Sequence, residues 1–432
     1  MSQIFIFLCY NLIIKKIKMS PKKINSKNKL KNKKLKLKVK KSRIIKKTQN
    51  KKSKNLKIKK NLKLKNKKSQ NKNIKILKKP TKRSLKPAKK SLKEIQQIKL
   101  LQKFDLPIIA PNPTNSWEAW QTFNPGVILL DDKIHFLYRA IGTDGVSRLG
   151  YAFSNDGFSI GERLPYPVYE HRVNNTLGFS IYSLFSGGSF FGAEDPRLTR
   201  VENEDKIYMT YTACDNGLRI GLTSISVSDF LNKKWNWKKP CLISPPGEVH
   251  KNWVIFPEKI NGKYAILHSL SPEILIEYRD ALDFSENECI KSYYNSNFKK
   301  NNGSWDNWIR GAGAPPIKTE LGWLLFYHAM TNGEFHKYKV GAMILDYKNP
   351  EKILYKLNYP VLEPQEGQGN NGFKPGVVYV TGAVVKDDML LVYYGAADSY
   401  INVAYAPLLK FLEAFKGGEK ITLKSKKLKT KK

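Results

Sequence analysis

Residues 124–140, NPGVILLDDKIHFLYRA, carry the pattern that decides the fold. A polar residue and a proline come first, and an apolar strand follows them. The acidic turn Asp131-Asp132 then leads into a second apolar strand, which ends in Tyr138 and Arg139. Two apolar strands around a short polar turn are typical of a β-hairpin.

Four later stretches repeat this pattern, at successive spacings of 73, 57, 59 and 67 residues. In the five copies the second strand ends at Tyr138-Arg139-Ala140, Tyr211-Thr212-Ala213, His268-Ser269-Leu270, Tyr327-His328-Ala329 and Tyr394-Gly395-Ala396. Most copies are followed by another apolar strand and an Asp-containing turn. A period near 60 residues with four short strands per unit predicts a β-propeller blade.

We therefore predict an all-β fold, a five-bladed β-propeller. A β-sandwich with coincidental hairpins is the alternative, and five copies with the same order of features argue against it. In a propeller the inner strands follow the central channel, so equivalent residues of different blades converge at one mouth. Arg139, His328 and the pair formed by Asp195 and Arg197 are accordingly predicted to be neighbours in space.

Charge divides the 432-residue chain into three parts. Residues 1–100 hold 38 basic residues and one acidic residue, and residues 416–432 hold eight Lys and one Glu. Residues 101–415 keep 31 basic and 34 acidic residues, so the net charge of +41 comes from the two ends. We predict a disordered basic arm over 1–100, a catalytic propeller over 101–415 and a basic tail over 416–432. A wholly disordered, collagenous or disulfide-stapled protein is excluded by the apolar middle and the four cysteines.

The arm over 1–100 is built almost entirely of Lys, Asn, Ile, Leu and Ser. Residues 20–100 contain no aromatic residue and offer no base stacking, so any contact of this stretch with a polyanion would be non-specific and salt-sensitive. Compositional drift toward Lys, Asn and Ile also explains the arm, and we favour this interpretation slightly over a role in binding. The apolar run Ile4–Ile14 is shorter than the roughly 20 residues of a membrane-spanning helix.

The four cysteines, Cys9, Cys214, Cys241 and Cys289, lie far apart and show no metal-binding spacing. They are interpreted as ordinary thiols of a reducing compartment. We expect an intracellular, cytoplasmic protein, with nuclear or surface-associated placement through the basic arm as the alternative.

The sharpest chemical motif is Gly192-Ala193-Glu194-Asp195-Pro196-Arg197. A carboxylate next to a proline is held by a rigid backbone, and Arg197, two residues further along a strand, points to the same side as Asp195. An arginine placed there can set the protonation of the carboxylate or bind an anion. Taken alone, the motif is better explained as a turn-forming Asp-Pro with a surface arginine.

GAEDPRLT resembles the signature of glycoside hydrolase family 130, whose members are five-bladed propellers that include β-mannoside phosphorylases and β-mannosidases. Further stretches follow in the order of that family over about residues 112–410, among them RLGYAFSNDGF, HKNWVIFPEKINGKY, GAGAPPIKTELGWLLFYHA and YYGAADSYINVAYA. The resemblance implies an inverting glycoside phosphorylase that cleaves β-mannosides with inorganic phosphate. The product implied is α-mannose 1-phosphate, and no cofactor is implied.

The resemblance also implies site residues. Asp195 matches the catalytic acid, which protonates the glycosidic oxygen through a sugar hydroxyl while phosphate attacks the anomeric carbon from the opposite face. An inverting enzyme pairs one acid with a nucleophile on the far side, and phosphate needs no second carboxylate to activate it. The basic residues that match positions around phosphate or the reacting sugar are Arg139, Arg197, Lys251 and His328, and those that match sugar-hydroxyl ligands are Asn124 and Asp398.

Other interpretations remain open for these residues. Arg139 could pair with Asp398, Lys251 could be solvated, and His328 could be a satisfied core histidine. Ser269 stands where many relatives have an arginine, which leaves the linkage specificity undetermined.

Two other functions also remain open. An inverting β-mannosidase on the same scaffold would need a glutamate as base, and Glu248, Glu258 or Glu366 is available for that role. A non-catalytic carbohydrate-binding propeller is the third hypothesis.

Overall fold

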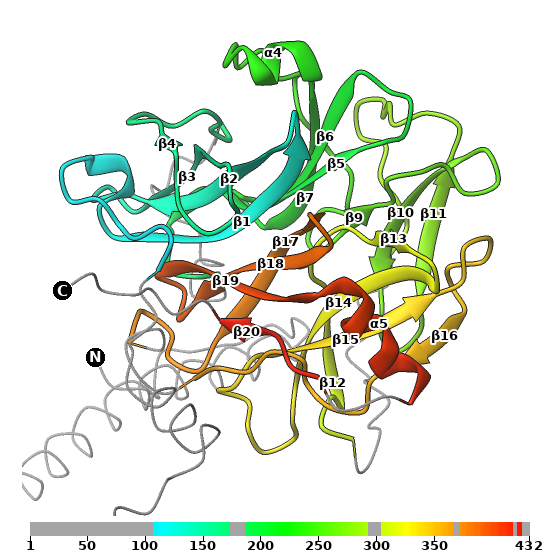
Figure 1. Ribbon diagram of the computed structural model, residues 1–432. Coiled ribbons are helices and arrows are strands. Elements are labelled where there is room, and N and C mark those ends of the chain that lie inside the picture. Colours follow the sequence, from blue (N-terminus) through cyan, green and yellow to red (C-terminus); the bar gives the residue numbers. More distant parts are fainter. Residues whose placement is uncertain (1–106, 173–185, 293–303, 366–370, 418–420, 426–432) are drawn as a thin grey trace, which may run out of the picture. The chain divides into compact units, whose positions relative to one another are not determined.

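The computed structural model describes residues 107–172, 186–292, 304–365, 371–417 and 421–425. All of them belong to one unit of the chain, Lys90–Lys432. The predicted arm and the apolar run Ile4–Ile14 lie outside the described residues. Figure 1 shows the strands of the unit in chain order, from cyan β1 to red β20.

The strands form five blades. Blade 1 holds β1 (Gln121–Leu130), β2 (Lys133–Ile141), β3 (Val146–Ser154) and β4 (Glu162–Arg163). Blade 2 holds β5 (Phe191–Arg200), β6 (Lys206–Cys214), β7 (Leu218–Ser226) and β8 (Cys241–Leu242), and blade 3 holds β9 (Val254–Ile255), β10 (Tyr264–Ser269) and β11 (Leu275–Arg279). Blade 4 holds β12 (Trp308–Ala312), β13 (Ile317–Thr319), β14 (Gly322–Met330), β15 (Lys339–Leu345) and β16 (Ile353–Lys356). Blade 5 holds β17 (Val378–Lys386), β18 (Met389–Ala396), β19 (Tyr400–Pro407) and β20 (Lys424–Ser425).

Within each blade the neighbouring strands are antiparallel, and a short parallel pairing of β3 with β5 joins blades 1 and 2 into one sheet. Helices are few and short among the described residues. They are η1 (Ser116–Glu118), α4 (Val227–Leu231), α5 (Leu408–Glu413) and η4 (Ala414–Lys416). The predicted all-β, five-bladed propeller is therefore confirmed.

The hairpin turns owe their shape to acidic residues in the left-handed region. Asp131 and Asp132 have φ values of 46° and 57°, and Asp387 and Asp388 have 50° and 59°. Two successive positive φ values define the type I′ turn, whose twist matches that of the flanking strands, and Asp tolerates this conformation better than most residues. The turns between β1 and β2 and between β17 and β18 thus lie where the sequence predicts them.

A tyrosine packed over a glycine recurs in blades 1, 2 and 4. The tyrosine lies three residues before the end of β2, β6 or β14, and the glycine lies directly opposite it on the next strand, β3, β7 or β15. A Cβ on the glycine would come within 2.3–2.4 Å of the tyrosine ring, so only glycine fits. The pairs are Tyr138–Gly150, Tyr211–Gly221 and Tyr327–Gly341.

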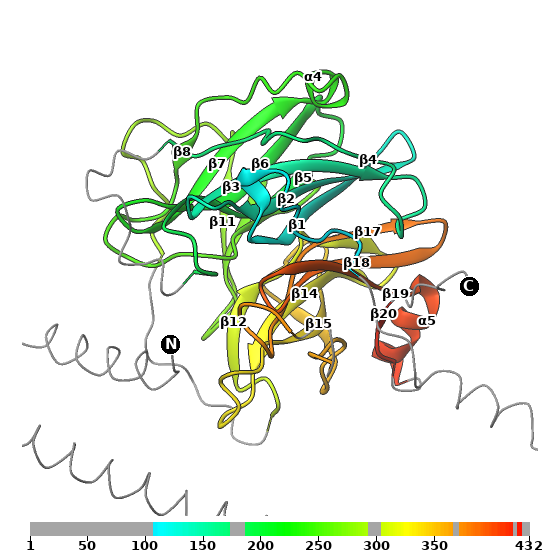
Figure 2. The same ribbon diagram turned by 90° about the vertical axis from the view of Figure 1, so that its left-hand side faces the viewer.

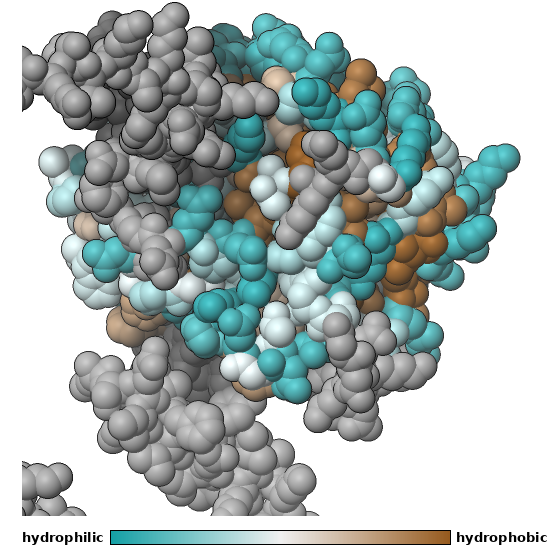
Figure 3. Space-filling model, turned by 60° about the horizontal axis from the view of Figure 1, so that its bottom comes forward, coloured by the Kyte–Doolittle hydropathy of each residue, from teal (hydrophilic) through white to brown (hydrophobic). Residues whose placement is uncertain are grey.

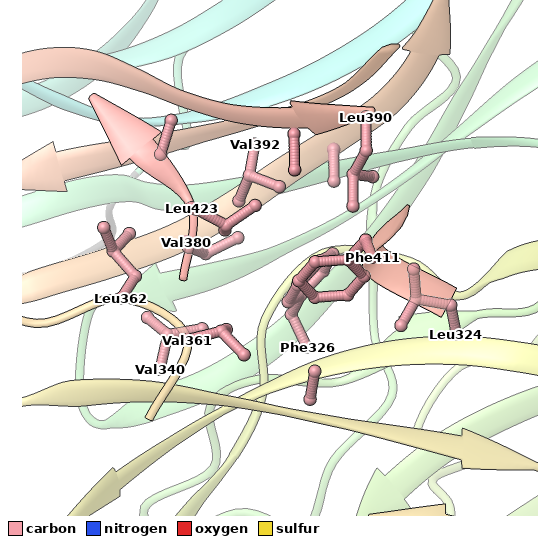
Figure 4. Packing of buried hydrophobic residues seen from close by; sticks show 14 of the residues in the cluster. Leu324, Phe326, Val340, Val361, Leu362, Val380, Leu390, Val392, Phe411 and Leu423 are labelled. Atoms are coloured by element: carbon pink, nitrogen blue, oxygen red, sulfur yellow. The ribbon is translucent and has the colours of Figure 1, made fainter. Parts of the chain in front are cut away.

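Five apolar clusters fill the five interfaces between neighbouring blades. Figure 4 shows the cluster between blades 4 and 5, in which Phe326 of β14 approaches Phe411 of α5. Leu423 belongs to the same cluster, so the fold continues beyond residue 415, where the predicted tail begins. The domain boundaries at 100 and 415 themselves stay predictions.

The ring is closed where blade 5 meets blade 1. Phe136 of β2 packs edge-on against Tyr393 of β18, with ring centroids 4.8 Å apart. The Ile108 N–H donates to the Ile401 carbonyl at 2.8 Å, which ties the beginning of the described domain to the last blade. Figures 1 and 2 both show cyan β1 beside orange β17 and β18. Closure of this kind buries the apolar faces of the first and last blades against each other.

Cys214, Cys241 and Cys289 are free thiols, and Cys9 lies outside the described residues. No helix in the described part of the chain is long and apolar enough to cross a membrane. Figure 3 shows one face of the molecule, on which hydrophilic residues predominate and hydrophobic areas are smaller.

Candidate active site

Irregularities in the innermost strands build the site. The pairing of β1 with β2 shifts between Phe123 and Gly126, and the pairing of β5 with β6 shifts between Glu194 and Arg197. Inside these bulges Asn124 and Asp195 adopt φ values of 48° and 51°. Residues held in this region cost about 1–3 kcal/mol each and are concentrated at functional sites. A bulge re-aims the side chain that it carries.

Asp195 is 2% exposed and receives its partners from three different elements. Its Oδ1 accepts from Asn124 Nδ2 at 2.7 Å and from an Arg139 guanidinium nitrogen at 3.0 Å. Lys251 Nζ lies 3.6 Å from the other oxygen, Oδ2. Burial alone would raise the pKa of Asp195, but Arg139 and Lys251 more than offset it and hold the pKa well below its usual range. Asp195 is therefore a carboxylate in this structure.

Glu194, the preceding residue, is fully buried and contacts the same two cations. Its carboxylate lies 3.0 Å from Arg139 and 3.2 Å from Lys251 Nζ. It also accepts hydrogen bonds from Ser189 Oγ at 2.8 Å and from Ser186 Oγ. Glu194 belongs to the motif Gly192–Arg197, but the sequence alone indicated no role for it.

Arg139 lies between the two carboxylates. Its second terminal nitrogen also donates to the Ser186 carbonyl, its Nε donates to Ser147 Oγ at 3.0 Å, and the guanidinium covers the Phe123 ring at 4.6 Å. Burial lowers the pKa of Arg139, and the carboxylates Glu194 and Asp195 outweigh this and raise it. Arg139 is thus a fixed cation, and its ion pairs join it to Glu194 and Asp195 rather than to Asp398, the alternative that the sequence left open.

Lys251 is held rather than freely solvated. Its side chain is 20% exposed and donates to Ser186 Oγ at 2.6 Å as well as to Glu194. Burial lowers the pKa of Lys251, but Glu194 and Asp195 raise it well above its ordinary value. Lys251 is therefore a permanent cation at physiological pH.

Arg197 supports the backbone of the site. Its Nε donates to the Gly313 carbonyl at 2.9 Å, and its two terminal nitrogens donate to the Asp195 carbonyl at 3.0 Å and to Asn252 Oδ1 at 2.8 Å. Arg197 is 2% exposed. These bonds clamp the bulge of β5 against blade 4, and all of the guanidinium nitrogens are used in them.

His328 is neutral. The Val380 N–H donates to its Nε2 at 2.9 Å, which places the ring proton on Nδ1, and Nδ1 has no hydrogen-bond partner among the described residues. The ring stacks on Tyr379 with centroids 4.1 Å apart. Burial, and after it Arg197, lowers the pKa of His328 to about 3. The structure thus places His328 beside the cations without making it one of them.

A cavity of about 260 Å3 opens at this place. Five of the predicted site residues line it, namely Asn124, Arg139, Asp195, Lys251 and Asp398, whereas Arg197 and His328 lie behind its wall. Asp398 has a φ of 49° and lies 3.3 Å from Lys374 Nζ.

The far side of the cavity is lined by blades 3 and 4, with His250, His268, Ser269, Arg310 and Tyr338. Burial, and after it His250, lowers the pKa of His268 to about 4. The side opposite Asp195 is thus built largely of neutral, hydrogen-bonding groups and of Arg310.

The two described glutamates that could act as the base of a hydrolase do not line the cavity. Glu248 pairs with His250 at 2.7 Å, Glu258 pairs with Lys318 at 2.7 Å, and neither lines the cavity. Glu366 lies outside the described residues.

Sequence reasoning missed several residues of the site. Besides Glu194 they are Ser186, Ser189, Asn252, Tyr379 and Lys374. A weak signal existed for Glu194, because a charged residue inside a strand with Gly and Ala before it is unusual. The serines and Tyr379 are common residue types, and only their position in space marks them.

Comparison with known proteins places the chain in a family. A family model described as beta-1,4-mannooligosaccharide phosphorylase matches residues 86–416. A 1,2-beta-oligomannan phosphorylase from Thermoanaerobacter sp. (strain X514) is 36% identical over 321 residues, which cover 71% of this chain and 97% of the relative. A beta-1,2-mannobiose phosphorylase of the same organism is 34% identical over 71% of this chain and 96% of the relative.

A solved structure agrees in fold. The beta-1,2-mannobiose phosphorylase from Listeria innocua superposes with a TM-score of 0.53 at 24% identity, over 69% of this chain and 93% of that one. The family model spans far more than half of the sequence, and the first two relatives are matched over nearly their whole length. The protein therefore belongs to glycoside hydrolase family 130.

Proposed function

We propose that the protein is an inverting glycoside phosphorylase that cleaves β-mannosides with inorganic phosphate and releases α-mannose 1-phosphate. Membership of the family makes it an enzyme acting on β-mannosides, and phosphorylase relatives support phosphorolysis. One structural observation carries the proposal: Asp195, Arg139 and Lys251 line the same cavity. An acid and two permanent cations are what a reaction between a glycoside and a phosphate dianion requires.

In the proposed reaction phosphate attacks the anomeric carbon from the face opposite the leaving oxygen. The bond between that carbon and the glycosidic oxygen breaks, a carbon–oxygen bond to phosphate forms, and Asp195 supplies the proton that the leaving oxygen takes up. The proton carried by hydrogen phosphate restores the acid afterwards. Protons and charge balance without a further reactant.

Asp195 must be protonated before it can act as the acid, although it is a carboxylate when the cavity holds no phosphate. A dianion bound by Arg139 and Lys251 offsets the positive field of these cations. The same dianion repels the negative charge of Asp195, so its pKa rises. Phosphate is thus both the nucleophile and the group that allows the acid to take up its proton.

We assign the cations different tasks. Arg139 and Lys251 line the cavity and contact phosphate, whereas Arg197 holds the backbone of Asp195 from behind. His328 contributes a neutral ring against Tyr379. Direct contact of Arg197 or His328 with phosphate stays a prediction from the sequence.

Asn124 and Asp398 are proposed to bind hydroxyl groups of the mannose that is transferred. Both line the cavity, and Asn124 already touches Asp195. The Asn124 Oδ1 atom is buried and has no hydrogen-bond partner among the described residues.

Hydrolysis is not favoured. Among the described residues that line the cavity, the carboxylates are Asp195 and Asp398, and Asp398 is paired with Lys374. A base that activates water for attack on the far face of the sugar would stand some 6.5–9.5 Å from the acid. Glu248 and Glu258, the described candidates for that base, are engaged elsewhere.

The two Thermoanaerobacter relatives are both named for β-1,2-linked substrates, so β-1,2-mannobiose is the substrate proposed first. The test compares β-1,2- and β-1,4-mannobiose with and without phosphate, and follows mannose 1-phosphate and its anomeric form by NMR. We expect α-mannose 1-phosphate from the β-1,2 substrate, only when phosphate is present. Equal release of free mannose without phosphate would overturn the proposal, and binding without turnover would identify a non-catalytic propeller.

The basic residues of 1–100 and 426–432 lie outside the described part of the chain. Contact with a polyanion and placement in a particular compartment therefore stay predictions from the sequence. The proposed function does not depend on them.

A further inference from the structure

Glu194 occupies a position that the reaction does not explain. It is fully buried and does not line the cavity, although Asp195, Arg139 and Lys251 all do. Its carboxylate nevertheless binds both cations, together with the hydroxyl groups of Ser186 and Ser189. Glu194 therefore contacts both of the cations that pair with Asp195, although it does not itself line the cavity.

The two cations are shared between two carboxylates, and Lys251 lies closer to Glu194 than to Asp195. Arg139 places one terminal nitrogen 3.0 Å from Glu194 and the other 3.0 Å from Asp195. Lys251 Nζ lies 3.2 Å from Glu194 and 3.6 Å from Asp195. The four groups together carry no net charge. Without Glu194, Asp195 would face two cations alone.

We propose that Glu194 is a positioning residue which fixes Arg139 and Lys251 at the cavity wall and neutralises half of their charge. The catalytic acid can then take up its proton when phosphate binds, and the phosphorylated product can leave. The inference rests on the proposed phosphorolysis and adds to it the residue that sets the strength of the phosphate site.

The other charged and titratable groups near Glu194 and Asp195 do not offset the charge of Arg139 and Lys251. Arg197 of β5 donates to the backbone carbonyl of Asp195 and not to either carboxylate. His328 of β14 is neutral, Tyr379 of β17 keeps its proton because burial raises its pKa to about 12, and Asp398 after β18 is paired with Lys374. Glu194 is thus the carboxylate that offsets the charge of Arg139 and Lys251 without lining the cavity.

The test is Glu194→Gln, which keeps the shape of the side chain and removes its charge. Phosphate affinity is measured by titration calorimetry, and kcat is measured across pH. We expect phosphate to bind about tenfold more tightly, because the site gains one net positive charge. We also expect the alkaline limb of the kcat profile to move down by about one pH unit, because the acid loses its proton more easily.

Two further variants make the test decisive. Glu194→Asp keeps the charge but withdraws the carboxylate by one methylene, so phosphate affinity and the alkaline limb should stay at the wild-type values while kcat falls about tenfold. Glu118→Gln is the matched control, because Glu118 is also fully buried and paired with an arginine, but that arginine, Arg163, does not line the cavity as Arg139 does. Glu118→Gln should lower the stability of the fold and leave phosphate affinity and the pH profile of kcat unchanged.

A folded Glu194→Gln variant with the phosphate affinity and pH profile of the wild type would overturn the inference. If that variant does not fold, Glu194→Asp decides, and a wild-type kcat in it overturns the inference as well. The failure of the proposed function is a different result: the wild type itself would then turn over without phosphate.

Discussion

Arg139 and His328 occupy the same position in two blades, and they end in opposite states. Each follows the tyrosine that packs over a glycine, at the end of the second strand of blade 1 or blade 4. Arg139 meets two carboxylates and lines the cavity. His328 meets a backbone N–H, a tyrosine ring and the field of Arg197, and it stays neutral behind the cavity wall.

The difference between Arg139 and His328 shows that equivalent positions in two blades need not have the same charge or contacts. The neighbours that decide the charge come from other blades. Glu194 and Asp195 of blade 2 reach Arg139, and Val380 and Tyr379 of blade 5 reach His328. Four changes would break or sharpen this comparison.

The largest effect is expected from Asp195→Asn, which removes the carboxylate that faces Arg139. A general acid contributes about 10²–10⁴ in rate, so kcat for phosphorolysis should fall by that factor. The measurement is mannose 1-phosphate release at saturating phosphate. Asp144→Asn, at a half-exposed ion pair with Arg148, serves as the control and should be close to wild type. Retention of more than a tenth of the activity in Asp195→Asn would contradict the role of Asp195.

The next effect is expected from Arg139→Lys. Lysine keeps the charge but lacks the planar fork that spans Glu194 and Asp195. Breaking a buried, hydrogen-bonded charge pair costs about 2–5 kcal/mol, so the KM for phosphate should rise about 100-fold.

Arg163→Lys is the matched control for this change. It alters an arginine paired with buried Glu118, outside the cavity. It should lower the melting temperature and leave the KM unchanged. Equal KM values in the two variants would show that Arg139 has only a structural role.

A smaller effect concerns the stability of the fold in acid. His328 titrates near 6.5 when unfolded and at about 3 when folded, so between these pH values the unfolded chain binds the extra proton. Stability from this residue is therefore complete above about pH 6.5 and falls as the pH decreases toward 3. The loss between pH 6.5 and 5 is about 2 kcal/mol for one such group.

His328→Gln removes this titration and keeps an acceptor for the Val380 N–H. The difference in melting temperature between pH 7 and pH 5 should be smaller in the variant than in the wild type. His268, with a pKa of about 4, remains in both proteins and leaves a residual slope. An identical pH dependence in the two proteins would mean that folding does not shift the pKa of His328, and would contradict the lowered pKa on which its neutral state rests.

The smallest effect is expected from the tyrosines that precede the two residues. Tyr138 donates to Glu118 at 2.8 Å and Tyr327 donates to Asp306 at 2.7 Å, and each carboxylate keeps a cationic partner. Replacement of either tyrosine by phenylalanine should cost about 1 kcal/mol of unfolding free energy. The measurement is denaturant unfolding, with kcat expected within twofold. A tenfold loss of kcat in one variant alone would show that the two blades are coupled differently to the site.

Much of the fold could be predicted because its signals are local. The turn at Asp131-Asp132, the alternation of the strands and the five repeats are properties of short stretches, and the blades follow from them. The candidate site was predictable in composition, since Asn124, Arg139, Asp195, Lys251 and Asp398 do line one cavity.

The arrangement within the site was not predictable. The sequence placed four basic residues around Asp195 as equivalent candidates, and the structure separates them. Arg139 and Lys251 lie at the cavity wall, Arg197 is bound to backbone and amide oxygens, and His328 has lost its charge through burial.

By itself, then, the sequence determined the repeated strands, the turns and the motif that carries Asp195, because each depends on residues close together in the chain. Only the tertiary structure decided which cations face the cavity, that His328 is neutral, and that Glu194 shares Arg139 and Lys251 with Asp195. The physical reason is that charge states follow burial and distances of about 3 Å between residues of different blades. Those distances exist only once the ring has closed.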